Sequence, residues 1–148
     1  MFGGWMSKIP KRFIIASVLY FATGITSGVI GSIVHGPEHL RTVHAHINLL
    51  GFVAMMLYGL AYWAIPHVSG NKIKSPYLAN VQFWLANIGL IGFAITNTVY
   101  AFVMIAPVRY AIGPFAAMEA LSGYLFAYNI IQTLKNKQPL QSVNKKAA

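Results

Sequence analysis

Four long apolar stretches joined by short polar loops limit the kind of fold that this chain can adopt. They cover about residues 13–34, 40–66, 77–105 and 110–134, and crossing the hydrocarbon core of a bilayer takes about 20 residues of α-helix. We expect all four to be helical, because lipid offers no partner to a free backbone amide. Only 9% of the residues are charged, against about 25% in soluble domains. The sequence therefore predicts an all-α integral membrane protein with four transmembrane helices.

The loops and their charges predict the topology. Short connections favour an up-down bundle that forms one domain, residues 1–134, followed by a polar cytoplasmic tail, residues 135–148. We interpret the first stretch as a retained helix and not as a cleaved signal peptide. Nine of the eleven basic residues fall on the side of the two termini, and only Arg41 and Arg109 fall on the other. The positive-inside rule then predicts a multi-pass protein of the inner (cytoplasmic) membrane with both termini in the cytoplasm.

Composition narrows the classes of function. The net charge is +9, but the basic residues gather at the tips of the apolar stretches, where they orient helices and meet anionic lipid headgroups. We therefore expect the partner to be the lipid bilayer and not a nucleic acid. The chain has no cysteine, which excludes disulfides, thiolate metal sites and covalent c-type haem attachment. A bound metal would have to rest on histidine, methionine, glutamate or carbonyl groups.

Polar residues on three of the stretches are predicted to reach a similar depth below the outer face. His44 and His46 open the second stretch, Asn97 lies near the outer end of the third, and Glu119 lies within the fourth. The helical rise places all of them roughly 9 to 13 Å from that end. A lone asparagine is equally explained by helix–helix contact, but ionisable groups inside a membrane are costly and indicate a functional site.

Helical geometry restricts how the two histidines can act. Positions i and i+2 differ by about 200° around a helix, so His44 and His46 are expected to face nearly opposite sides and not to clamp one ion. His39 shares the face of His46 and makes a second candidate metal ligand. Without thiols, a buried imidazole suits haem iron. Arg41 and Arg109 at the outer boundary could pair with haem propionates.

Residues 41–66 carry a resemblance to a known family. The run RTVHAHINLLGFVAMMLYGLAYWAIP resembles the second transmembrane helix of haem-copper oxidase subunit I, particularly in the cbb3-type oxidases and nitric oxide reductases. The matching residues are Arg41, His44, the aromatic pair Tyr62-Trp63, and Pro66. The resemblance implies that His44 is an axial ligand of a low-spin haem b. His46 matches a His-Ala-His-x-Asn-Leu-Leu-Gly run in short relatives, and we expect it to be a second ligand or the ligand of a second metal.

The sequence also departs from that family. Full-length members have many more helices and place further histidine ligands on them, whereas no histidine follows His67 here. A complete terminal oxidase activity is therefore not expected from one protomer, although an oxidoreductase role stays open. Members are pseudo-threefold, which suggests a homo-oligomer, a trimer or a dimer, in which a second protomer supplies the other imidazole. Alternatively, an open haem face lined by Glu119 or Asn97 would bind nitric oxide or oxygen.

Three functions follow as hypotheses. The first is a membrane protein that binds haem b for electron transfer or diatomic-gas handling, with a redox partner protein and with Glu119 as a candidate proton relay. The second is a copper or other metal-handling protein that uses His39, His44, His46 and Glu119. The third is a non-catalytic subunit of an oxidase complex.

Overall fold

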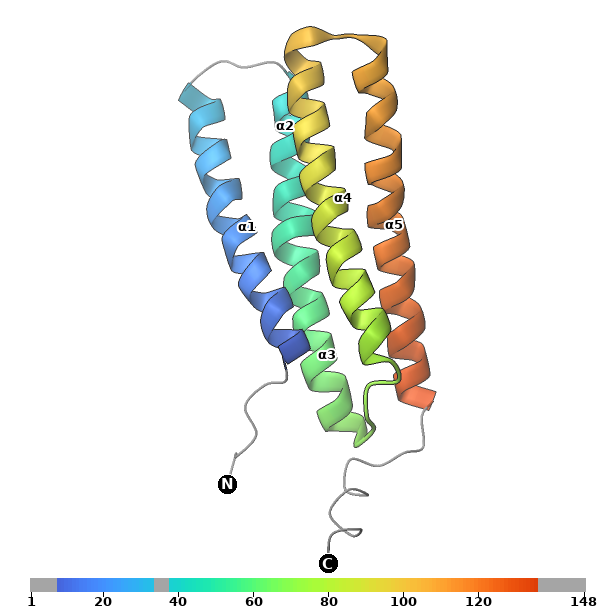
Figure 1. The fold of residues 1–148 in the computed structure, drawn as a ribbon. Helices are drawn as coiled ribbons and strands as arrows, with labels where there is room; N and C mark the ends of the chain where they lie inside the picture. The colour runs from blue at the N-terminus through green and yellow to red at the C-terminus, as the bar shows by residue number, and fades with distance from the viewer. Residues whose placement is uncertain (1–7, 34–37, 136–148) are drawn as a thin grey trace, which may run out of the picture.

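The protein is a bundle of four helical rods (Figure 1). The computed structural model describes residues 8–33 and 38–135, and of residues 38 and 39 it describes the backbone only. The first rod is α1, Lys8–Ile33, and the third and fourth are α4, Pro76–Val103, and α5, Ala106–Lys135. The second rod is continuous through α2, Glu38–His46, the π-helix η1, Ile47–Ala54, and α3, Met55–Ser69. The rods alternate in direction, as predicted.

The first two rods extend beyond their predicted limits at the end where the chain begins. Helix α1 begins at Lys8 and not at residue 13, because Pro10 is compatible with a first helical turn and the aliphatic stems of basic residues can lie along an apolar surface. The second rod continues through Pro66 to Ser69 and not to residue 66. It stops at Gly70, whose φ of 68° is the left-handed conformation that terminates helices.

The other two helices also differ from prediction at their ends. Helix α4 begins after Ser75, whose side chain accepts a hydrogen bond from the Leu78 amide at 3.2 Å, as helix-capping residues do. It ends at Val103 and not at residue 105, because Met104 has a φ of 49°. Helix α5 then starts at Ala106, four residues earlier than predicted, and reaches Lys135. The predicted tail beyond residue 135 lies outside the described residues.

Three of the rods are long and apolar enough to cross a membrane by length and composition: Lys8–Ile33, Leu40–Ser69 and Pro76–Val103. Helix α5 has 30 residues but is not among these three. Its charged residues, Arg109, Glu119 and Lys135, and its scattered amide and hydroxyl side chains lower its apolar character. The chain is a multi-pass membrane protein, and a fourth crossing by α5 stays a prediction.

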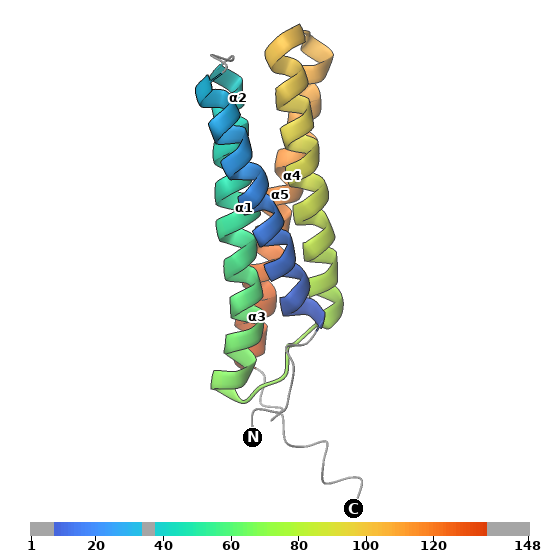
Figure 2. The ribbon, with the colours of Figure 1, turned by 90° about the vertical axis from the view of Figure 1, so that its left-hand side faces the viewer.

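The four rods pack as two pairs. Figure 2 shows α1 beside the second rod in one layer and α4 beside α5 in the other. Between the layers, α2 contacts α4 and α3 contacts α5. The pair α4 and α5 is close-packed, since a Cβ atom at Gly89 would lie only 3.0 Å from the carbonyl oxygen of Phe115. Such small residues let membrane helices approach closely.

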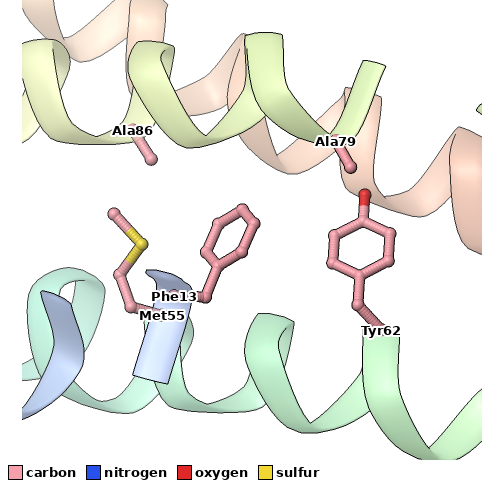
Figure 3. Close-up of a cluster of buried hydrophobic side chains, with 5 residues drawn as sticks. All are labelled: Phe13, Met55, Tyr62, Ala79 and Ala86. Carbon is pink, nitrogen blue, oxygen red and sulfur yellow. The ribbon is translucent and has the colours of Figure 1, made fainter. Parts of the chain in front are cut away.

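The hydrophobic core lies between the layers, nearer the end where α1 begins. Figure 3 shows Phe13 of α1 and Met55 and Tyr62 of α3 facing Ala79 and Ala86 of α4. All five side chains are buried. The alanines leave room on α4 for the three large side chains, which is the alternation of large and small residues that fills a core at high density.

A buried polar cluster caps this core at what we call the lysine-rich end, where α1 begins, α3 joins α4 and α5 ends. The hydroxyl of Tyr62 donates to Oε1 of Gln82 at 2.6 Å, and Nδ2 of Asn129 lies 3.3 Å from the same hydroxyl. Asn129 also bonds both backbone groups of Ser75, accepting from its amide at 3.0 Å and donating to its carbonyl at 2.9 Å. The cluster thus ties α3, α4 and α5 together.

Candidate functional site

His44 lies on α2 at the opposite end of the bundle and packs against α1. Its Nδ1 is 3.0 Å from the carbonyl oxygen of Gly24 and 3.3 Å from Oγ of Ser27. Nδ2 of Asn48, one turn further along the rod, donates to the carbonyl of His44 at 2.9 Å and lies 3.3 Å from Nδ1 of its ring. The imidazole is therefore partly buried and fixed from two helices.

Two glycines of α1 make the space for this arrangement. A Cβ atom at Gly24 would lie 2.5 Å from Oδ1 of Asn48, and one at Gly28 would lie 2.7 Å from Cε1 of His44. Their spacing of four residues is the small-xxx-small pattern that permits close helix contact in membranes. The sequence interpretation did not use this signal, although it was visible in the sequence.

We predict that Gly28→Ala destabilises the contact between α1 and α2. The added methyl group would push the His44 ring away from its carbonyl partner, and over-packing costs about 1–3 kcal/mol. Gly31→Ala is the matched control, because a Cβ atom there would meet nothing within 4 Å among the residues that the structure describes. Thermal unfolding of both variants in the same detergent measures the difference. Equal unfolding temperatures would contradict the contact.

His46 faces the other layer. Its ring stacks on Phe93 of α4 with the centroids 4.4 Å apart and the planes inclined by 32°. Its Nδ1 is 2.8 Å from the carbonyl oxygen of Thr42, one turn earlier in α2. His44 thus contacts α1 while His46 contacts α4, which confirms the prediction that the two rings face opposite sides.

Both rings share one feature that matters for metal binding. A carbonyl oxygen can only accept a hydrogen bond, so an Nδ1 that bonds to one must carry the proton in a neutral imidazole. Nε2 is then the nitrogen left with a lone pair, and such a bond from Nδ1 is the usual way in which proteins orient a ligating histidine. Nε2 of His44 has only a long contact of 3.5 Å to Nδ2 of Asn48. Among the described residues, none bonds Nε2 of His46.

Asn97 and Glu119 lie along α4 on either side of the contact between His46 and Phe93. Asn97 is buried and its Nδ2 donates to the carbonyl of Phe93 at 2.9 Å, so its amide serves its own helix. Glu119 packs against Gly89 of α4, one turn from Phe93 on the other side. The Asn97 amide thus reaches the level of Phe93, on which His46 stacks, while Gly89 lies about 6 Å from Phe93 along α4. That all four groups share one layer stays a prediction.

Glu119 remains an unusual group in this position. Its Oε1 is buried and has no hydrogen-bond partner, and within the described part of the chain the only other such atom is Nε2 of Gln82. An unpaired buried carboxyl oxygen is costly. Glu119 therefore has spare capacity to hold a proton or to accept a hydrogen bond.

The remaining candidate ligands lie apart. Arg41 on α2 and Arg109 on α5 are exposed, near the same end of the bundle, where α2 and α5 begin (Figure 1). Within residues 8–33 and 38–135, no three histidine, cysteine, aspartate or glutamate side chains come close enough to hold a metal ion together. The side chain of His39 lies outside the described residues, so its predicted role as a ligand is not placed. His67 is exposed at the lysine-rich end and bonds the Trp63 carbonyl through Nδ1.

Comparisons with known proteins place residues 5–140 within the family model described as cytochrome c and quinol oxidase polypeptide I. A cytochrome c oxidase subunit 1 homolog of Agrobacterium tumefaciens is 27% identical over 93% of this chain, and the match covers 31% of the homolog. The cbb3-type cytochrome c oxidase subunit CcoN1 of Stutzerimonas stutzeri is 34% identical over 54% of this chain, which is 18% of that subunit. The chain therefore spans less than a third of the length of these relatives.

Proposed function

Because the chain belongs to the cytochrome c and quinol oxidase polypeptide I family, we propose that it is a membrane protein that binds b-type haem through His44. The observation that carries the proposal is the bond from Nδ1 of His44 to the Gly24 carbonyl, which leaves Nε2 to coordinate iron. The contact to α1 fixes the orientation of the ring before any ligand arrives. Bound haem would supply one-electron redox chemistry and affinity for diatomic gases.

The residues around His44 suit an amphipathic cofactor. The histidines lie near the start of the apolar rod Leu40–Ser69, which favours the macrocycle. Arg41 and Arg109 at the same end of the bundle are exposed guanidinium groups of the kind that pair with propionates. Nine basic residues on the side of the termini, against these two, support a location of His44 near the outer face of the inner membrane. The role that follows is electron transfer with a redox partner protein, or handling of nitric oxide or oxygen.

We further propose that the second axial ligand comes from another copy of the chain. His46 faces α4 and not α1, so it does not reach the iron that His44 of the same chain would hold. It would serve a second site or a neighbouring protomer. An assembly of two or three copies would supply pairs of imidazoles, and Glu119, with its unpaired oxygen, would hold a proton near them.

The copper hypothesis has less support from the geometry. Its candidate ligands point apart, with His44 toward α1 and His46 toward α4, and Glu119 packs against Gly89, about one turn further along α4. A tight copper site needs its ligands to converge on one point. The arrangement therefore favours haem, which can be bound by one protein ligand on each side.

Visible spectroscopy of the purified protein tests the proposal. We expect a Soret band that sharpens on reduction, with resolved α and β bands, and a haem-to-protein ratio near one by pyridine haemochrome assay. A colourless protein that binds copper would support the metal-handling alternative, and a protein that binds neither would support the role of a non-catalytic oxidase subunit. Either result would overturn haem binding.

A further inference from the structure

We propose that the π-helix Ile47–Ala54 sets the rotation of α2 about its axis and thereby decides which neighbouring helix each histidine faces. The haem-related part of this proposal rests on the proposed function, but its geometric part does not. A π-helix bonds each residue to the fifth along and so holds more residues per turn than an α-helix. These segments are rare and are frequent at functional sites.

The burial pattern of the second rod shows what the π-helix does. Five buried residues follow one another at a constant spacing of four: Val43, Ile47, Gly51, Met55 and Gly59. On the regular helix α4 the buried positions combine steps of three and four, as in Gln82, Ala86, Gly89 and Phe93, and the longest run at a spacing of four has four members, Gly89, Phe93, Asn97 and Ala101. In a regular α-helix, with about 100° per residue, Gly59 would lie about 160° around the helix axis from Val43, so the five residues would not share one face. The wide turns of the π-helix, which hold about one extra residue, absorb about 100° of this rotation.

The π-helix is fixed in place by contacts to both layers. A Cβ atom at Gly51, in its middle, would lie 2.6 Å from Cγ of Tyr20 on α1 and 2.9 Å from Cδ2 of Leu90 on α4. The rod therefore cannot turn at this point without a clash. Rotation set here passes directly to α2, because His46 is the residue immediately before the π-helix.

The consequence for the histidines is large. The π-helix stores about one residue more than an α-helix of the same number of turns would hold. If the π-helix became a regular α-helix without losing a residue, α2 would turn by about 100° relative to α3. His44 would then leave Gly28, and His46 would leave Phe93.

Deletion of single residues tests whether the π-helix holds one residue more than a regular α-helix would. The chain has no cysteine, so His46→Cys with Phe93→Cys reports on whether these positions remain adjacent, by cross-linking with a short bifunctional thiol reagent in native membranes. Deleting Leu49, an exposed residue of the π-helix, should convert it to α-helix and keep the cross-linking yield within about twofold, since the faces of α2 and α3 stay aligned. Deleting Ile91, an exposed residue of the regular helix α4, should lower the yield by more than about tenfold, because the outer part of α4 turns by about 100°.

A compensating insertion completes the test. An alanine inserted after Ala54 should abolish cross-linking, because the π-helix already holds about one extra residue and cannot take a second. Combining this insertion with the Leu49 deletion should restore the yield. In the histidine-containing protein, the Leu49 deletion should also keep the position of the reduced α band. Loss of cross-linking on deleting Leu49, whatever its cause, overturns the proposal. A colourless protein with the expected cross-linking pattern would instead overturn haem binding and leave this proposal intact.

Discussion

Replacing His44 by alanine is expected to remove most of the haem from the purified protein, lowering the haem-to-protein ratio more than about tenfold. Loss of an axial nitrogen removes the bond that holds the iron, whereas changes to outer-shell partners alone typically cost 10- to 100-fold in affinity. Apolar contact with the macrocycle would not compensate. The measurement is the Soret absorbance per protein after identical expression and purification.

His67→Ala is the matched control for this experiment. Its Nδ1 also bonds a backbone carbonyl, that of Trp63, but its ring is exposed at the lysine-rich end of the rod, at the opposite end of the bundle from His44. We expect the haem content of this variant to be unchanged. His46→Ala assigns the second histidine, and full haem retention in both His44→Ala and His46→Ala would contradict histidine ligation by this segment.

The helical architecture could be predicted because lipid leaves few alternatives. A long apolar run in a membrane has to be helical, so the four rods and their alternating directions follow from the sequence. Their ends were less predictable, since a run such as Lys8–Arg12 is polar by composition and yet continues α1 at the boundary. The wide turns of the π-helix were also missed, because a uniform 100° per residue was assumed for the whole rod.

The candidate site was predicted in part. The opposite faces of His44 and His46 follow from helical geometry alone, because both lie in the regular helix α2, before the π-helix. What each ring touches depends on the packing of α1 and α4, which one sequence does not reveal. The role of His44 as haem ligand stays a prediction based on the family resemblance and on the orientation of its ring.

The buried polar cluster at the lysine-rich end was not predicted, although it left a trace in the sequence. Ser122, Asn129 and Thr133 lie at spacings of seven and four on α5 and so share one face. All three are completely buried, as is Gln82 on α4. Polar residues at this spacing on an apolar helix indicate helix–helix contact through hydrogen bonds. Asn129 extends this contact to the connection between α3 and α4, because it bonds the backbone of Ser75.

Asn129→Ala is therefore expected to lower the free energy of unfolding by about 2 kcal/mol. A typical interhelical hydrogen bond in a membrane protein contributes only about 0.6 kcal/mol. This change removes three such bonds and leaves the Ser75 amide without its partner, while the Ser75 carbonyl keeps the Ala79 amide and the Tyr62 hydroxyl keeps Gln82. An unsatisfied buried group costs about 1–3 kcal/mol. Unfolding in mixed detergent and sodium dodecyl sulfate measures the change. Gln132→Ala, at a half-buried amide three residues further along α5 with no side-chain hydrogen bond in the described residues, should stay within about 0.5 kcal/mol of the unaltered protein. If the two variants unfold alike, the cluster does not hold the α3–α4 connection to α5.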